Sequence, residues 1–299
     1  MSASHDILID LCICSYKRPE ITDLLRQVSE QTGFPRDRLR VIVADNTEDA
    51  MMRKRAIEAG KAHNLNLRYV HAPANNISIA RNACLDHAEA PWVAFLDDDE
   101  TPTPDWLGAL WREALAGQWD AVLGPVKALY PPQAPSWLTL GDFHSTAPVW
   151  VRGRIRTAYT GNVLFRREKV ERLHLRFREE LGKSGGEDED FFYRLFDAGG
   201  RIGFAADAIV CETVPPDRAH FTWLMRRNFR AGQSHGARLN QRGKRLRDIT
   251  IASAKASWCC AAAAICAAHT IRRNRFLTRA ALHVGVVARL MRIKQIELY

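Results

Sequence analysis

Hydrophobic and polar residues alternate along the first 116 residues in blocks that suit β-strands and α-helices in turn. Short apolar runs rich in Val, Ile and Leu are typical of buried strands, and longer stretches with apolar residues three or four apart are typical of amphipathic helices. Such an alternation predicts an α/β fold with a largely parallel sheet and helices on both faces. The predicted strands are 8–15, 39–45, 67–72 and 92–96, and the predicted helices are 20–31, 51–63, 77–87 and 104–116, the last with Pro104 in its first turn.

Four polar segments lie beside the ends of these predicted strands. In open parallel sheets, ligands bind beyond the carboxyl ends of the strands. Each segment by itself is typical of an ordinary loop, but their joint order predicts one polar rim. The segments are Ser15–Pro19, Asp45–Thr47, Asn75–Asn76 with the Arg81–Asn82 pair of the following helix, and Asp97–Asp99.

Three adjacent carboxylates, Asp97, Asp98 and Asp99, follow the apolar run 92–96. A bound cation would offset the mutual repulsion of these carboxylates, and carboxylate oxygens are the ligands that hard divalent cations prefer. The segment therefore predicts a metal site. A turn after a strand is the plain alternative, because Asp is a common turn residue.

A second acidic run, Glu187–Asp190, precedes the aromatic stretch 191–196. Acidic residues are favourable in the first turn of a helix, so the run predicts a helix start. Capping accounts for one or two of the four acids, which leaves a candidate general base among the others. Gly182, Gly185 and Gly186 lie just before the run and predict a loop that can move, although loop glycines are often simple turns.

Composition indicates a globular protein. The chain has 299 residues, 46% of them hydrophobic, and can form one large domain with an appendage. Its seven cysteines contain no CxxC pair, and the N-terminal residues do not resemble a signal peptide. A cytoplasmic protein with reduced thiols is therefore expected.

Charge is distributed unevenly along the chain. Residues 218–299 carry 17 Lys and Arg against Asp248 and Glu297, a net charge of +15, which leaves −6 for the rest of a chain whose total is +9. Basic tails bind phosphate, in lipid headgroups or in nucleic acid. The basic block 242–247 has no interleaved aromatic residue for base stacking, so no nucleic-acid partner is expected.

The tail also holds the apolar run Ala256–Ala268, which is too short to span a bilayer. Basic blocks at 242–247 and 272–275 flank it. The run is expected to lie in a membrane interface or to form a helical hairpin with 280–293, and an Ala-rich core helix packed on the catalytic body is the alternative. Upstream, Arg226, Arg227 and Arg230 have near-helical spacing and suit either a diphosphate contact or a solvated basic helix.

Taken in order, these motifs resemble the GT-A glycosyltransferases of family 2, over about residues 7–215. The closest likeness is to bacterial exopolysaccharide enzymes of the succinoglycan-assembly type. The motifs that carry it are Cys14–Pro19, Val43–Asn46, Asn76–Asn82, Phe95–Glu100, Thr160–Asn162 and Gly186–Phe191.

The resemblance implies an inverting, metal-dependent transfer of a sugar from a nucleotide diphosphate, expected to be UDP. It implies that Asp188 is the base that removes the acceptor hydroxyl proton, with Glu187 as second candidate. It implies Mg²⁺ or Mn²⁺ held by Asp99, with Asp97 contacting the ribose and the ion. The nucleotide-sugar-binding residues that it implies are Ser15, Tyr16, Arg18, Asp45, Asn76, Arg81, Asp97, Asp98 and Asn162.

A division of the chain follows: residues 1–216 as the GT-A catalytic domain and 217–299 as a basic, helical, membrane-associated region. The expected partners are a nucleotide-sugar donor, a glycan or polyprenyl-diphosphate-linked acceptor, and the anionic inner face of the plasma membrane. A nucleotidyltransferase is a rival, but the loop at 15–19 lacks the expected glycines. A non-catalytic membrane or nucleic-acid-binding protein leaves both acidic clusters unexplained.

Overall fold

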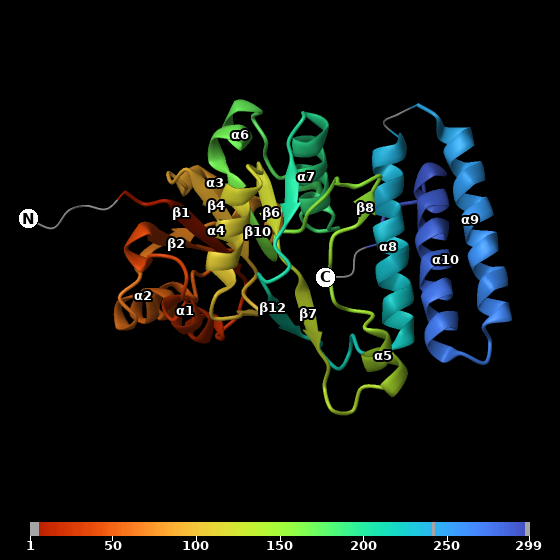
Figure 1. Ribbon diagram of the computed structural model, residues 1–299, viewed down its shortest axis with the longest axis horizontal. Coiled ribbons are helices and arrows are strands. Elements are labelled where there is room, and N and C mark those ends of the chain that lie inside the picture. The colour runs from red at the N-terminus through yellow and green to blue at the C-terminus, as the bar shows by residue number, and fades with distance from the viewer. Residues whose placement is uncertain (1–5, 241–242, 297–299) are drawn as a thin grey trace, which may run out of the picture. The chain divides into compact units, whose positions relative to one another are not determined.

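The computed structural model describes residues 6–240 and 243–296 and divides into two compact units (Figure 1). The first, which we call the sheet unit, comprises the described residues of Met1–Lys127, Ser145–Lys183 and Glu187–Glu212. The second, the helical unit, comprises those of Ala128–His144, Ser184–Gly186 and Thr213–Tyr299. The segments of the two units therefore alternate along the chain. The sequence predicted a single boundary, after residue 216.

A seven-stranded sheet forms the centre of the sheet unit, in the order β11-β6-β10-β4-β1-β2-β3. The four predicted strands are present and run parallel: β1 (Ile9–Ser15), β2 (Leu39–Asp45), β3 (Asn66–His71) and β4 (Trp92–Leu96). The sheet is extended beyond β4 by strands of three to five residues that the sequence did not predict: β10 (Asn162–Arg166), which is antiparallel to β4 and β6, then β6 (Ala121–Leu123) and β11 (Ile202–Phe204). The mostly parallel α/β architecture is thus confirmed.

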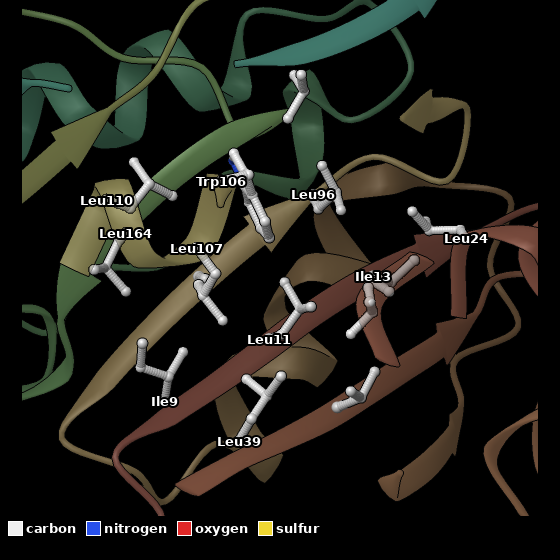
Figure 2. Close-up of a cluster of buried hydrophobic side chains, with 14 of the residues drawn as sticks. Ile9, Leu11, Ile13, Leu24, Leu39, Leu96, Trp106, Leu107, Leu110 and Leu164 are labelled. Carbon is white, nitrogen blue, oxygen red and sulfur yellow. The ribbon is translucent and has the colours of Figure 1, made fainter. Parts of the chain in front are cut away.

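Helices cover both faces of this sheet, as predicted. Alternate residues of a strand point to opposite faces. Ile9, Leu11 and Ile13 of β1 therefore join one buried cluster, and Cys12 and Cys14 join another. Figure 2 shows the first cluster, with leucines from the helices packed over the strands. Its helices are α1 (Ile21–Ser29), α2 (Arg53–Ala62) and α4 (Trp106–Ala116), and those of the second cluster are α3 (Ile77–His87), α6 (Arg167–Arg172) and α7 (Glu187–Asp197).

Helix α4 begins at Trp106, two residues later than predicted. The backbone before it is engaged elsewhere: Thr103 donates its N–H to the carbonyl of Ile209, and the Pro104 carbonyl accepts from the N–H of Thr32. These bonds hold residues 103–104 outside the helix. The minor elements of the sheet unit are η1 (Arg36–Arg38), β5 (Glu100–Pro102), β8 (Trp150–Val151), β9 (Arg154–Ile155) and η2 (Glu179–Leu181), and β12 (Val210–Thr213) pairs with β5.

Three long helices dominate the helical unit: α8 (Phe221–Asn240), α9 (Arg245–Ile265) and α10 (Thr270–Leu290). Helix α8 confirms the helical spacing of the arginines at 226–230. Gly232 of α8 and Gly285 of α10 lie where the two backbones approach so closely that a Cβ at either position would meet a carbonyl oxygen of the other helix at 1.9–2.0 Å. Short α5 (Ser136–Gly141) and part of β7 (Val126–Leu129) complete the unit.

The Ala-rich run lies mostly in α9, which forms a hairpin with α10. Within this hairpin, Trp258 of the run contacts Phe276 of α10. Val286 and Leu290, in the predicted partner segment 280–293, pack instead with Ala252, which precedes the run. Within residues 6–240 and 243–296, no helix combines the length and the apolar character needed to cross a membrane. Of the basic block at 242–247, Arg242 lies outside the described residues.

Candidate functional site

The predicted polar rim is formed by the carboxyl ends of β1, β2 and β4. Strand β1 lies between the other two, and its last residue, Ser15, pairs in register with Asp45 of β2. Asp97 follows β4 directly. Parallel pairing therefore brings three of the four polar segments to one edge of the sheet, all within the sheet unit.

The acidic segment after β4 presents partly exposed carboxylates. The side chain of Asp97 is 40% exposed and that of Asp99 is 32% exposed. Asp99 forms an ion pair with Arg18 from the segment after β1, at 3.0 Å. Glu100 is buried behind them, and its Oε2 accepts a hydrogen bond from the Asp97 N–H at 3.2 Å. Glu100 thus fixes the backbone of the loop that carries the three aspartates 97–99.

Burial and mutual repulsion shape the protonation of this segment. Burial and the charge of Asp99 raise the pKa of Asp98 to about 7. The same two causes raise the pKa of Asp97, against the attraction of Arg81. Burial and then Asp97 raise the pKa of Glu100 well above its ordinary value. All three carboxyls therefore gain from a nearby cation.

Arg81 joins this segment to the second acidic run. It lies on α3, is only 6% exposed, and its Nη1 donates to Glu187 at the start of α7. Its Nη2 lies 3.4 Å from Oδ1 of Asp97. Its guanidinium also lies 5.8 Å from the centre of the Phe177 ring, which suits a cation–π contact. One buried cation thus links the end of β4 to the first turn of α7.

The four acids at the start of α7 have different partners. Glu187 is 5% exposed and is committed to Arg81. Asp190 pairs with Arg194 at 2.8 Å and with Arg178 at 3.4 Å. Asp188 accepts a hydrogen bond from the N–H of Glu189 at 2.7 Å and makes no ion pair with any described residue. Ion pairs with arginines therefore engage Glu187 and Asp190 but not Asp188 among the described residues, which makes Asp188 a candidate for chemistry.

Asp188 also has the protonation behaviour of a general base. Burial, followed by the negative charge of Glu187, raises its pKa to about 7, against the attraction of Arg81. A carboxylate with a pKa near the working pH is well matched to accept a proton.

Asp45 is fully buried and organises the loop after β2. Its Oδ1 accepts from the N–H of Thr47 at 2.9 Å and from the Thr47 hydroxyl at 2.6 Å. Its Oδ2 accepts from the N–H of Met52 at 3.1 Å and from the Tyr69 hydroxyl at 2.8 Å. The predicted contact of Asp45 with a nucleotide base stays a prediction, and such a contact must share the carboxylate with these four donors.

The motif at Asn76–Asn82 ties α3 to a neighbouring loop. Asn76 caps α3 by accepting from the N–H of Ser78 at 3.0 Å, and its Nδ2 donates to the carbonyl of Glu179 at 2.9 Å. Asn82 exchanges two hydrogen bonds, both 2.9 Å, with the backbone of Phe177. These contacts hold the helix that carries Arg81, and the predicted role of Asn76 in donor binding stays a prediction.

Asn162 begins β10 opposite Leu96, the last residue of β4, so it lies at the same edge of the sheet as the acidic segment but is buried there. Its side chain is fully buried, accepts from Trp106 Nε1 at 2.8 Å, and donates to the carbonyls of Pro125 at 3.0 Å and Ala208 at 2.7 Å. Its predicted role in donor binding stays a prediction. Ser15 is 1% exposed and Tyr16 is 39% exposed, so of these two only the tyrosine ring is open to a ligand.

Sequence reasoning missed Glu100 and Tyr69. Glu100 had a visible signal, because it is the fourth acid of the run 97–100, and this run follows the strand directly. Tyr69 had none, because an aromatic residue inside a strand is ordinary for a sheet. Its hydroxyl reaches Asp45 only through the pairing of β3 with β2.

Two acidic clusters are thus joined by a buried arginine at the carboxyl edge of a largely parallel sheet, where α/β proteins commonly bind ligands. Comparison with known proteins identifies the family. The family model described as "Glycosyl transferase family 2" matches residues 10–173, and "Glycosyl transferase family group 2" matches residues 92–291. The chain is 49% identical to the succinoglycan biosynthesis protein ExoM of Rhizobium meliloti over 97% of this chain and 95% of that protein. The chain belongs to glycosyl transferase family 2 and is a glycosyltransferase.

More distant relatives share the fold. The glycosyltransferase AglE of Haloferax volcanii is 26% identical over 75% of this chain and 72% of its own length. The mannosyltransferase PcManGT of Pyrobaculum calidifontis, solved with GDP-Man and Mn²⁺, superposes with a TM-score of 0.63 at 20% identity, over 97% of this chain and 89% of that one. S. aureus TarS 1-349, solved with UDP, superposes with a TM-score of 0.57 at 18% identity, over 94% and 91%. The GT-A type of fold is thereby confirmed.

Proposed function

We propose that this glycosyltransferase moves a sugar from a UDP-sugar, with inversion, to a glycan or polyprenyl-diphosphate-linked acceptor in bacterial exopolysaccharide assembly. The similarity to ExoM, a succinoglycan biosynthesis protein, supports a role in exopolysaccharide assembly. The UDP and UDP-GlcNAc complexes of TarS support the uridine donor. The observation that carries the chemistry is the pairing of Arg81 with Glu187, which leaves Asp188 unpaired by any cation within the described residues.

The proposed base is Asp188. Its carboxylate takes the proton of an acceptor hydroxyl while that oxygen bonds to the anomeric carbon and the bond from this carbon to the diphosphate breaks. Attack from the side opposite the leaving diphosphate inverts the configuration. Glu187 acts by holding Arg81, whose position near Asp97 suits it to orient the donor.

A divalent cation fits the donor oxygens present here. Asp97 and Asp99 offer partly exposed carboxylates, and Oδ2 of Asp98 between them is buried. Among the described residues, no group of three or more His, Cys, Asp or Glu is placed to hold a metal ion. Mg²⁺ and Mn²⁺ sites of this type need only one or two carboxylates, because donor phosphates and water complete the shell. Mg²⁺ or Mn²⁺ bound there stabilises the negative charge that develops on the departing nucleoside diphosphate.

The Arg18–Asp99 ion pair belongs to the same proposal. Arg18 places a positive charge against the carboxylate that is proposed to bind the cation, at 3.0 Å. A cation held by Asp99 would compete with Arg18 for this carboxylate. The Arg18 guanidinium, with its planar set of donors, would then be suited to pair with phosphate oxygens of the donor.

A screen of donors tests the function. Release of nucleoside diphosphate is measured with UDP-, GDP- and dTDP-sugars, with Mg²⁺, Mn²⁺ or EDTA present and a membrane extract as acceptor source. We expect release from a UDP-sugar that requires a divalent cation. Release from only GDP- or dTDP-sugars contradicts the uridine assignment, and undiminished release in EDTA contradicts the metal.

We further propose that the chain works at the anionic inner face of the plasma membrane, bound through α9. Ile251, Trp258 and Ile265 are seven residues apart and 41%, 62% and 86% exposed, so they form one outward line. The residues that α9 buries lie on the opposite side: Ala252, Ala256, Cys259 and Ala263.

Charge favours an anionic bilayer as the partner of this line. Residues 256–268 carry no charge, and the exposed Arg247 and Lys255 lie before them. Arg272 and Arg279 of α10 are exposed beyond them. An apolar face that contains Trp and is bordered by basic residues is typical of helices that lie in the membrane interface. Each basic residue that reaches such a surface contributes up to about 1 kcal/mol.

Flotation with liposomes tests this surface. The full chain is expected to float with vesicles that contain phosphatidylglycerol, to be released in part by high salt, and to ignore neutral vesicles. Replacing Trp258 and Ile265 by Ser should abolish flotation. Leu140→Ser is the matched control, because Leu140 is 77% exposed on α5 outside the line. Binding that ignores lipid charge and resists salt favours insertion of 256–268, and no binding refutes the membrane role.

A further inference from the structure

The segment just before the proposed base leaves the sheet unit for three residues. Ser184, Gly185 and Gly186 belong to the helical unit, whereas residues up to 183 and from 187 belong to the sheet unit. Asp188 follows Gly186 by two residues. A turn that belongs to the helical unit is therefore joined to the proposed base through one intervening residue, Glu187.

The turn has little conformational preference of its own. Gly185 and Gly186 have φ angles of +78° and +91°, in a region that side chains disfavour. Two successive glycines leave the backbone with many accessible conformations. A fixed position for the residues that follow requires contacts from outside the turn.

Helix α8 supplies one such contact through Arg230. Its Nη1 donates to the Ser184 carbonyl at 2.8 Å. The guanidinium lies so close to the turn that a Cβ on Gly185 would meet Nη1 at 1.9 Å, and a Cβ on Gly186 would meet the Ser234 hydroxyl at 2.8 Å. Both glycines are therefore needed for α8 to approach the backbone.

The C-terminal segment supplies the second contact. Gln233 of α8 is fully buried, donates to the Lys294 carbonyl at 3.0 Å and accepts from the Ile296 N–H at 3.0 Å. This pair of bonds holds Gln295, whose Nε2 lies 3.4 Å from the Gly185 carbonyl and 3.1 Å from the Ser234 hydroxyl. Arg230, 46 positions along the chain from Ser184, and Gln295, 110 positions from Gly185, thus both contact the turn.

We infer that Arg230 and Gln295 are positioning residues for glycosyl transfer, and that the C-terminal helices belong to the catalytic machinery. They act on Asp188 through the Ser184–Gly186 turn and touch neither donor nor acceptor. This inference rests on the proposed role of Asp188 as base. A displacement of about 1 Å in a reacting group can lower a rate by about 100-fold, so loss of these contacts is expected to lower kcat.

Steady-state kinetics of Arg230→Ala and Gln295→Ala, with donor affinity measured by calorimetry, test the inference. We expect kcat to fall by about 10- to 100-fold in Arg230→Ala and by less in Gln295→Ala, with the Kd for the donor nucleotide within about twofold of wild type. Arg230→Lys, which keeps a donor for the Ser184 carbonyl, should recover part of kcat. Asn240→Ala is the control, because Asn240 is exposed at the end of the same helix, and should leave kcat unchanged.

Three outcomes overturn the inference. They are unchanged kcat in Arg230→Ala, an equal loss in Asn240→Ala, and a loss of kcat in Arg230→Ala accompanied by an equal loss of donor affinity and of folded protein. The proposed base is tested separately by Asp188→Asn. If Asp188→Asn turns over normally, the base assignment fails whatever Arg230→Ala does.

Discussion

Removing the charge of Glu187 should destabilise the sheet unit. Arg81 and Glu187 are 6% and 5% exposed, and Gln at 187 keeps the shape of the side chain while leaving the guanidinium buried without its main partner. Breaking a buried ion pair in this way costs about 3–5 kcal/mol. Asp97, 3.4 Å from Arg81, retains part of the compensation, but its side chain is 40% exposed and therefore screened. We expect a loss near the lower limit, about 3 kcal/mol.

Calorimetric unfolding measures this loss. At about 2–4 °C per kcal/mol for a unit of this size, the transition of the sheet unit should fall by roughly 6–12 °C in Glu187→Gln. Glu168→Gln, at an exposed position on α6, is the control and should change stability by less than about 0.5 kcal/mol. The double variant Arg81→Met/Glu187→Leu, which buries no unpaired charge, should be more stable than Glu187→Gln. The reasoning is refuted if Glu187→Gln unfolds at the wild-type temperature or if the double variant is the least stable of the three.

Three further predictions concern protonation and the metal. Because Asp188 has a pKa of about 7 and must be deprotonated to act, kcat/KM should rise as the pH rises through about 7. A flat profile of kcat/KM from pH 5 to 8 argues against Asp188 as the base. Asp99→Asn should abolish transfer at any metal concentration while Asp97→Asn chiefly raises the donor KM, and full activity of both variants in EDTA removes the metal-dependent mechanism. Burial and the charge of Arg227 lower the pKa of His144 from 6.5 to about 4, so the unfolded chain takes up this proton first. His144 should therefore cost stability as the pH falls from 6.5 towards 4, by at most about 3 kcal/mol, and urea titrations of His144→Phe should lose that pH dependence.

The parallel half of the fold was predictable because its signals are local. Strands β1, β2 and β4 are mostly apolar and fully buried, and their ends carry polar residues that parallel pairing must bring together. Strands such as β6, with three residues, are too short to show a period, and their pairing is decided by the rest of the sheet. The sequence therefore predicted the part that positions the rim and missed the antiparallel extension.

The candidate site shows the same division. The acidic runs at 97–99 and 187–190 can be recognised in the sequence. Which of these acids form ion pairs cannot be predicted from it. Only tertiary packing brings Arg81 to Glu187, 106 positions away, and so distinguishes Glu187 from Asp188. The hydrogen bond from Arg230 to the Ser184 carbonyl could not be predicted either. Every residue has a backbone carbonyl, so the acceptor leaves no signal in the sequence.

The most direct test of the account is turnover by Asp188→Asn, compared with its affinity for the donor nucleotide. If Asp188 is the general base, kcat should fall by about 10²- to 10⁴-fold while the donor Kd stays near that of wild type. Normal turnover by Asp188→Asn, together with an inactive Glu187→Gln that still folds, contradicts the account and moves the base to Glu187.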